Sequence, residues 1–425
     1  MRRSGRIGLD ICLSCAHANV TPMHTTTQNH TAALSGITGR RVLGAAGIAP
    51  ATLGFAQGSI APQTPTNGPC IDARNLLVLP GIVDIHGDAF ERSVMPRPGV
   101  SFPYGPALLD VDRQLLAHGI TTEFHGVTLS WEGGLRGEAY AIRMFEALAQ
   151  LQPVLGASHK VHLRFEAYHL AGVETAMQWM KEGRVNLLAI NDHLPTLARR
   201  MNDDRKLAQY AERAECEMEA FRTRLRNASR HAQDVPAEMS RLIAAARAAH
   251  LPVASHDDPD AATRQHYHRQ GCGIAEFPLT VEVAALARQL GDETVFGAPN
   301  VLRGKSHTGA PNATEMIAAG LCTVLASDYY YPAPLQAAFR LVQLGICDLP
   351  AAWHLVSRNP ARAAGLRDRG VLMPGMRADA ILVDDSDPGL PRVCAAIVNG
   401  ELRHANTALP MIDAASLGQR ASLAA

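Results

Sequence analysis

A histidine and an aspartate follow an apolar segment, residues 75–83 with the sequence NLLVLPGIV, that is typical of a buried strand. His86 and Asp88 are two positions apart, so on a strand their side chains point to the same side. An imidazole and a carboxylate in this arrangement can bind one divalent cation together. The spacing therefore predicts a metal site at the end of this segment.

The same kind of ending recurs after four later apolar segments. The residues at these ends are His162 and Glu166, Asp192 and His193, His256 with Asp257 and Asp258, and Asp328. In a (β/α)₈ barrel the carboxyl ends of the strands meet at one mouth, where the active site lies. Imidazoles and carboxylates gathered there predict a site for one or two divalent cations, Zn²⁺, Mn²⁺ or Mg²⁺, that activate water for hydrolysis.

Some of these residues have structural interpretations that the sequence leaves open. His162 shares its face of the strand with Arg164 and can be a structural histidine. The Asp257–Asp258 pair can cap the helix that follows it. Asp192 can orient the metal-binding histidine next to it through a hydrogen bond.

Basic and hydroxyl-bearing residues are concentrated in segments predicted as loops. The segment MPRPG holds one arginine between two prolines, which restrict its backbone. Residues 298–312, APNVLRGKSHTGAPN, combine basic side chains with glycines that let backbone N–H groups approach a ligand. Such donors bind phosphate oxygens, so the predicted partner is a phosphorylated small molecule. The predicted phosphate-binding residues are Arg97, Arg303, Lys305, Ser306, His307 and Tyr329.

The elements that must position these residues follow an alternating pattern. From residue 71 onward, about eight apolar strand-like runs alternate with helical stretches, which predicts an α/β fold with a (β/α)₈ TIM-like barrel. A barrel needs about 250 of the 425 residues. After the barrel, predicted as residues 71–365, short strands with tight turns predict a small β-sandwich-like module at 366–410, built from the segments that flank the barrel, and a tail at 411–425. Residues 1–70 show no sustained periodicity and are predicted to be a disordered leader.

Composition excludes several classes of partner. Lys+Arg and Asp+Glu are balanced at 40 each, so no overall field favours nucleic acid or an anionic membrane. No apolar run reaches the ~20 residues of a membrane span, and the cysteines, isolated except for Cys12 and Cys15, predict free thiols. Residues 40–57 are similar to a twin-arginine export signal, but Pro50 interrupts the run and Met1 is distant. We therefore predict a cytoplasmic protein.

Ten motifs, in order between about residues 77 and 400, carry a family resemblance: LPGIVDIHGD, MPRPGV, GITT, HLRFE, NDH, ASHDD, AEFPLT, GAPNVLRGKSHTG, ASDYYYPAPLQAAFR and RGVLMPGMRADAILV. They resemble the amidohydrolase superfamily and, within it, the alpha-D-ribose 1-methylphosphonate 5-triphosphate diphosphatase family of phosphonate catabolism. The resemblance implies a metal-dependent barrel that hydrolyses a ribosyl 5-triphosphate to a 5-phosphate and pyrophosphate. The implied metal ligands are His86, Asp88, Glu166, His193, His256 and Asp328. Glu166 would bridge the cations, and Asp328 would accept a proton from the attacking water.

Two other functions remain as alternatives. A cyclic amidohydrolase or deaminase would keep the barrel, but a neutral ring needs few of the basic loop residues. A barrel that binds a ligand without catalysis is the second alternative, although every implied ligand is present. The chain departs from the family pattern at Lys305, where glycine is common, and in residues 1–70, which lack the β-rich segment that completes the family's small domain. Barrels of this kind often form homodimers, and the sequence leaves the oligomeric state open.

Overall fold

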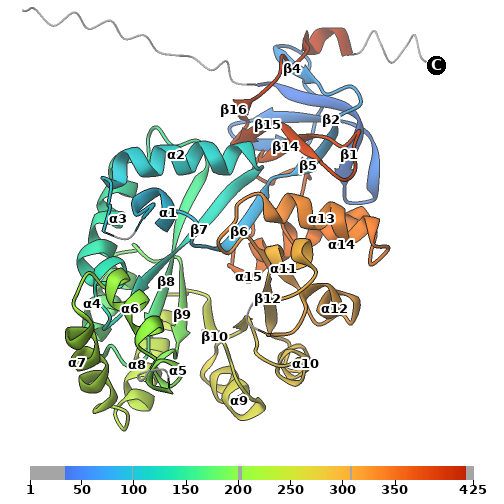
Figure 1. Cartoon of the computed structure of the whole chain (residues 1–425). Helices are drawn as coiled ribbons and strands as arrows, with labels where there is room; N and C mark the ends of the chain where they lie inside the picture. Colours follow the sequence, from blue (N-terminus) through green and yellow to red (C-terminus); the bar gives the residue numbers. More distant parts are fainter. Residues whose placement is uncertain (1–33, 98, 200–202, 307–308, 418–425) are drawn as a thin grey trace, which may run out of the picture. The chain divides into compact units, whose positions relative to one another are not determined.

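The computed structural model of the chain describes residues 34–97, 99–199, 203–306 and 309–417. Its central feature is an eight-stranded parallel sheet that curves into a nearly closed barrel (Figure 1). The strands, which neighbour one another in chain order, are β6 (Ile82–Gly87), β7 (Ile120–Leu129), β8 (Ser158–Glu166), β9 (Leu187–Asn191), β10 (Val253–His256), β11 (Ile274–Glu276), β12 (Glu293–Gly297) and β13 (Val324–Ala326).

The seam of the barrel lies between its first and last strands. A parallel bridge joins Gly87 to Asp328 just beyond the end of β13. The N–H of Asp328 donates to the carbonyl of His86 at 3.0 Å, and the N–H of Asp88 donates to the carbonyl of Asp328, also at 3.0 Å. The seam is therefore closed at the carboxyl ends of the two strands, where the predicted metal ligands are.

Helices cover the outside of the barrel strands, and the core has two layers. Val83, Phe124 and Ala254 belong to the cluster inside the barrel, whereas Leu163 and Phe165 of β8 face outward and pack with the helices. The helices and 3₁₀ turns are α1 (Glu91–Val94), α2 (Tyr104–Ala117), η1 (Gly134–Arg136), α3 (Glu138–Leu151), η2 (Leu170–Gly172), α4 (Val173–Lys181), α5 (Leu194–Arg199), α6 (Asp204–Arg213), α7 (Met218–Ser229), α8 (Val235–Ala248), α9 (Ala261–Gln270), α10 (Val281–Gln289), α11 (Ala298–Arg303), α12 (Ala313–Ala318), α13 (Ala333–Gln343), α14 (Leu349–His354), α15 (Arg358–Ala363) and η3 (Ala414–Ser416).

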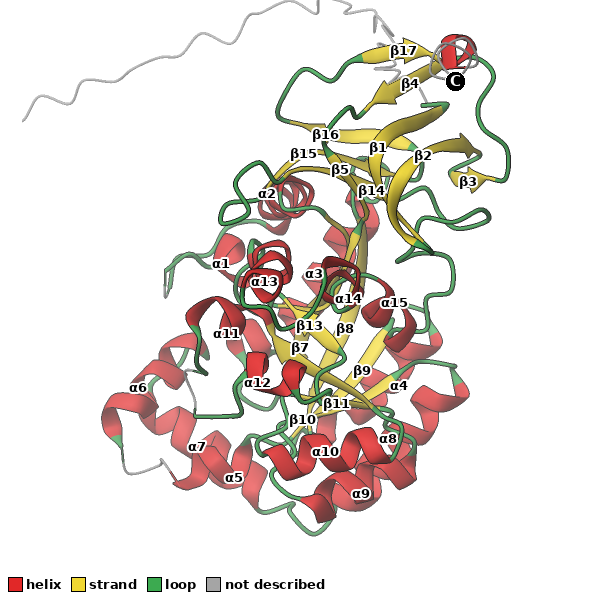
Figure 2. Ribbon diagram, turned by 90° about the vertical axis from the view of Figure 1, so that its right-hand side faces the viewer, coloured by secondary structure: helices red, strands yellow, loops and turns green. Residues whose placement is uncertain are grey.

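A second, mixed sheet contains both segments that flank the barrel (Figure 2). Its central order is β16-β15-β14-β5-β1-β2-β3, with β4 paired to both β1 and β17. The predicted barrel with a small β-module made from the flanking segments is thus confirmed. The strands of this module are β1 (Gly36–Gly44), β2 (Gly47–Ala56), β3 (Ser59–Ala61), β4 (Pro69–Asp72), β5 (Leu77–Pro80), β14 (Ala380–Asp384), β15 (Arg392–Val398), β16 (Glu401–Ala405) and β17 (Met411–Asp413).

The prediction of a disordered leader up to residue 70 was wrong for residues 36–70, which form four strands of the β-module. The pairing of β1 with β2 shifts register between Gly39 and Val42, and such a bulge interrupts the alternation of side chains that identifies a strand in sequence. Backbone hydrogen bonds join β1 to β2, β4 and β5, and the pattern of side chains along the sequence does not report these bonds. Residues 1–33, including Cys12 and Cys15, lie outside the described residues.

Two predicted boundaries also need correction. The first apolar segment is two strands, because β5 belongs to the β-module and β6 to the barrel. They separate at Gly81, where a Cβ atom would lie only 2.1 Å from Oγ1 of Thr121, so no other residue fits without movement. At the other end, residues 411–413 are strand β17 and belong to the sheet, where a tail was predicted.

The segment that is similar to an export signal is part of the folded β-module. Residues 40–57 span most of β1 and β2, and the guanidinium of Arg41 donates to both carboxylate oxygens of Asp385, at 2.7 and 2.6 Å. Cleavage at the end of this segment would remove two strands from the sheet, so the segment has a structural role, and the compartment stays a prediction. None of the helices in the described ranges is long and apolar enough to cross a membrane. The cysteines at positions 70, 216, 272, 322, 347 and 394 are free.

Candidate metal centre at the barrel mouth

The structure brings the predicted strand-end residues together at the carboxyl ends of the barrel strands. Among the described residues, three groups have ligand atoms that all lie within 4.8 Å of one another. The groups are His86 with Asp88 and Asp328, His193 with His256 and Asp257, and His86 with His162 and Glu276. Five of the six predicted metal ligands are therefore members of such a group, and the sixth, Glu166, contacts His193 directly.

The first group spans the seam between β6 and β13. His86 is buried, whereas Asp88 and Asp328 are half-buried, and the backbone of Asp328 adopts a positive φ of 55°. A non-glycine residue in this left-handed region is strained, and such strain is concentrated at functional sites. Burial, and then the neighbouring carboxylate of Asp88, raises the pKa of Asp328 to about 7. Two carboxylates this close repel each other unless a cation or proton lies between them.

The second group joins the ends of β9 and β10. Nδ1 of His193 lies 2.6 Å from Oε1 of Glu166, and its Nε2 lies 3.4 Å from Oδ2 of Asp257. Burial disfavours the charged imidazole, but Glu166 and Asp257 outweigh it and raise the pKa of His193 to about 9. Burial likewise opposes ionisation of Glu166, yet His193 and then Arg136 and Arg164 lower the pKa of this carboxyl.

The third group lies deepest and contains two residues outside the predicted ligand set. Nδ1 of His86 is 3.2 Å from Oε1 of Glu276, and Nε2 of His162 is 3.6 Å from Oε2 of the same carboxylate. The other nitrogen of His162 contacts the carbonyl of Ile85 at 2.9 Å. Burial lowers the pKa of His162 to about 3, so this imidazole is neutral.

Sequence reasoning missed Glu276, although the signal was present. It ends β11 within the motif AEFP, just as the predicted ligands end their own strands. The side chain is fully buried, and Phe277, the next residue, has a positive φ of 50°. A carboxylate at the end of a short apolar strand therefore indicates a candidate metal ligand as much as a histidine does.

Two structural interpretations offered by the sequence are wrong. The N-terminus of α9 is capped by Asp260, whose side chain accepts from the N–H of Thr263, so the Asp257–Asp258 pair does not cap it. Asp258 instead binds Ser255 and Arg264 in the barrel wall. Likewise Glu166, and not Asp192, holds the ring of His193. Asp192 has an exposed side chain.

The residues at the mouth fit a divalent cation. Neither ring nitrogen of His256 has a hydrogen-bond partner, although Nδ1 lies 3.3 Å from Asp257, and Nε2 of His162 and Oε2 of Glu276 also lack one. Buried polar atoms without partners are rare and need an explanation, such as an ion. Imidazole and carboxylate donors together suit first-row divalent metals such as Zn²⁺ and Mn²⁺. The types of ligand atom, and the buried ones without hydrogen-bond partners, thus fit the predicted divalent metal.

Among the described residues, the predicted phosphate-binding residues lie on loops, except Arg303, which is the last residue of α11, and their role remains a prediction. The side chains of Arg97, Arg303 and Lys305 are exposed, and Ser306 is half-buried. Nη1 of Arg303 donates to the hydroxyl of Tyr329 at 3.4 Å, which joins the last residue of α11 to the segment that follows β13. His307 lies outside the described residues.

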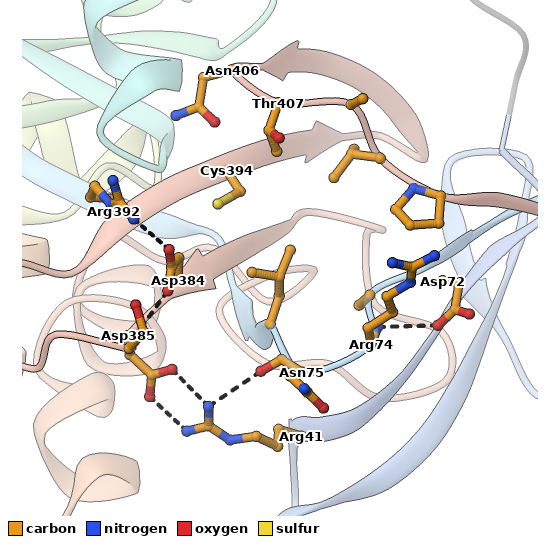
Figure 3. A pocket seen from close by; sticks show the side chains of 16 residues that line it. Arg41, Asp72, Arg74, Asn75, Asp384, Asp385, Arg392, Cys394, Asn406 and Thr407 are labelled. Atoms are coloured by element: carbon orange, nitrogen blue, oxygen red, sulfur yellow. Dashed lines mark hydrogen bonds and ion pairs between the residues drawn. The ribbon is translucent and has the colours of Figure 1, made fainter.

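A separate cavity of about 840 Å³ lies in the β-module and not at the barrel mouth (Figure 3). Its lining includes two ion pairs, Arg41 with Asp385 and Arg392 with Asp384. None of the three groups of candidate metal ligands found among the described residues includes a residue that lines it. The three groups of candidate metal ligands in the described ranges are therefore separate from this cavity.

Comparison with known proteins decides the family. Over 327 residues the chain is 34% identical to the alpha-D-ribose 1-methylphosphonate 5-triphosphate diphosphatase of Escherichia coli (strain K12), which covers 75% of this chain and 85% of that enzyme. The chain belongs to this diphosphatase family. The family resemblance inferred from the motifs is thus confirmed, and the protein is a hydrolase of the family by homology and fold. No protein-family model matches the sequence.

Solved structures of other proteins show the same fold at low sequence identity. An amidohydrolase from an environmental sample of the Sargasso Sea aligns with a TM-score of 0.58 and 15% identity, over 92% of this chain and 97% of that one. The 5-methylcytosine deaminase of Klebsiella pneumoniae aligns with a TM-score of 0.57 and 17% identity, over 88% and 98% of the two chains. These likenesses establish an amidohydrolase fold for the diphosphatase family member described here.

Proposed function

We propose that the protein is a metal-dependent phosphoanhydride hydrolase that converts a ribosyl 5-triphosphate to a 5-phosphate and pyrophosphate, with alpha-D-ribose 1-methylphosphonate 5-triphosphate as its substrate. The observation that carries this proposal is the 34% identity, over three-quarters of the chain, to the alpha-D-ribose 1-methylphosphonate 5-triphosphate diphosphatase of Escherichia coli. The convergence of imidazoles and carboxylates at the barrel mouth supports it, because anhydride hydrolysis needs an activated water and neutralised phosphoryl oxygens.

The proposed cation ligands are His86, Asp88, His193, His256 and Asp328, with Glu166 beside them and Glu276 added from the structure. A divalent cation held there would act as a Lewis acid toward a phosphoryl oxygen and lower the pKa of a water molecule. Zn²⁺, Mn²⁺ and Mg²⁺ are the candidates. The fixed backbone on both sides of the β6–β13 seam positions the first of these groups.

The proposed reaction breaks one bond between two phosphoryl groups. The oxygen of a water molecule forms a new bond to phosphorus, the anhydride bond between the first and second phosphorus breaks, and pyrophosphate leaves. We assign the proton of the attacking water to the carboxylate of Asp328, which lies in the strained position at the end of the last strand. Arg303, Lys305 and Tyr329 would contact phosphate oxygens from the loops.

The test is a pyrophosphate-release assay on the full chain with Mn²⁺, Zn²⁺ or Mg²⁺ added separately. We expect release from alpha-D-ribose 1-methylphosphonate 5-triphosphate with at least one of these cations, and none after a chelator is added. A folded sample that releases no pyrophosphate with any of the three cations contradicts the proposal. Hydantoin and dihydroorotate are the matched controls, since turnover of either would instead favour a cyclic amidohydrolase.

A further inference from the structure

A group of arginines lies beside the candidate metal ligands. None of these arginines belongs to the predicted phosphate-binding residues. Arg136 follows β7 at the end of η1, Arg164 points from β8 toward Asp88, and Arg213 ends helix α6. Nη1 of Arg136 and Nη2 of Arg213 lie 3.2 and 3.0 Å from the two oxygens of Glu132, a fully buried carboxylate. Two guanidinium groups thus share one carboxylate.

This arginine group, Arg136 with Arg164 and Arg213, reaches the candidate metal centre. Nη1 of Arg164 lies 3.4 Å from Oδ2 of Asp88, a member of the first ligand group. A Cβ atom on Gly126 would lie 3.2 Å from Cδ of Arg164, so the glycine of β7 leaves the space that this side chain occupies. The arginine group is therefore continuous with the site at which the reaction is proposed to occur.

Hydrogen bonds within the protein leave one donor of each guanidinium group without an acceptor, although the carboxylates of Glu91 and Glu166 also interact electrostatically with this arginine group. The Nε atoms of Arg136, Arg164 and Arg213 are all buried without a hydrogen-bond partner. Arg136 and Arg213 nevertheless keep 15% and 30% of their side chains exposed, so an incoming ligand can reach them. Burial and then the charge of Arg136 lower the pKa of Arg213, whereas Glu132, Glu91 and Glu166 outweigh burial and raise the pKa of Arg136.

Helices α6 and α7, which follow β9, contact the loop that carries Arg136. Trp131, in the loop after β7, packs with Phe221 of α7 at a ring distance of 5.7 Å, and Arg224 of α7 donates to the carbonyl of Glu132. Helices α6 and α7 thus fix the loop that carries Arg136 and supply Arg213 themselves.

We propose that Arg136, Arg164 and Arg213 form an anion subsite for a phosphoryl or phosphonyl group of the substrate, on the side of the barrel mouth made by β7, β8 and α6. This inference rests on the proposed function and names a second set of substrate contacts for it. Guanidinium groups suit such a ligand because their donors match the oxygens of a tetrahedral anion in pairs. The subsite accepts either the polyphosphate end or the phosphonate end of the substrate.

The test is calorimetric titration of pyrophosphate, and separately of methylphosphonate, into the full chain with and without Mn²⁺. We expect Arg136→Gln and Arg213→Gln to weaken binding of one of these anions by at least about tenfold, the loss typical of a charge-assisted hydrogen bond. Weakening for pyrophosphate alone assigns the subsite to the polyphosphate end, and weakening for methylphosphonate alone assigns it to the phosphonate end. Arg222→Gln is the matched control, because this α7 arginine pairs with Glu219 and Asp204 at the surface and should bind as the unaltered protein does.

Arg213→Lys guards against a variant that fails to fold, since lysine keeps the charge opposite Glu132 but loses the paired donors. We expect it to fold and to bind more weakly than the unaltered protein. Unchanged dissociation constants in Arg213→Lys and Arg136→Gln, or no binding of either anion to the unaltered chain, would overturn the subsite. Failure of the proposed function is distinguishable, because it would show as anion binding without pyrophosphate release from any triphosphate.

Discussion

Replacement of Asp84 by alanine tests how the barrel seam positions its ligands. The carboxylate is fully buried and accepts the backbone N–H of His86 at 3.2 Å and that of Ser327 at 3.2 and 3.1 Å. These two N–H groups belong to a predicted ligand and to the residue before Asp328. Each buried donor left without an acceptor costs about 1–3 kcal/mol, so Asp84→Ala should lose about 2–6 kcal/mol of unfolding free energy.

The assay is urea unfolding followed by tryptophan fluorescence, together with the metal content of the purified variant. Asp84→Asn is the matched control, because its amide oxygen can still accept both N–H groups, and we expect it to lose no more than about half as much stability. The alanine variant should also bind less metal, since His86 and Asp328 would no longer be fixed. Stability within about 1 kcal/mol of the unaltered protein, with full metal content, would refute the reasoning.

Three further predictions follow from the same contacts. Asp328→Asn should reduce pyrophosphate release by about 10²–10⁴-fold, the usual contribution of a general base, and a smaller loss would remove this residue from that role. Arg264→Met should lose about 3–5 kcal/mol of unfolding free energy because it leaves the buried carboxylate of Asp258 without its cation, whereas the surface variant Arg241→Ala should leave the urea midpoint unchanged. Burial opposes ionisation of Asp112, but the hydrogen bonds from His159 and two backbone N–H groups lower its pKa. The contribution of ionised Asp112 to the free energy of unfolding is therefore complete above the pKa of the unfolded state, about 3.9. It is lost as the pH falls through the lower pKa of the folded state. The difference in unfolding free energy between the unaltered protein and Asp112→Asn should therefore narrow below about pH 4.

The arrangement of the barrel and most ligand positions could be predicted because the relevant signals are local. A parallel strand is buried on both faces, so β9, with the sequence LLAIN, reads as an apolar run, and the polar residues that follow it stand out. All barrel strands point the same way, so a residue at the carboxyl end of any strand must lie at the common mouth. No pairing between distant residues had to be known for this inference.

The strands before the barrel could not be predicted in the same way. The bulge in β1 removes the alternation of side chains, and much of β2 is exposed, so hydrogen bonds to distant strands decide their structure. The division of one apolar segment between two sheets depends on the contact of Gly81 with Thr121, forty residues further along the chain. A sequence pattern cannot report such a contact.

By itself, the sequence determined which residue types stand at the strand ends and hence the class of chemistry that the mouth can perform. Only the tertiary structure decided which of them share a ligand group, that Glu276 lies between His86 and His162, and that Asp84 holds the seam. It also placed Arg213 against Glu132, residues separated by 81 positions in the chain. The physical reason is that periodicity and strand direction are local properties, whereas hydrogen bonds and charge pairs depend on distances that exist only after the chain has folded.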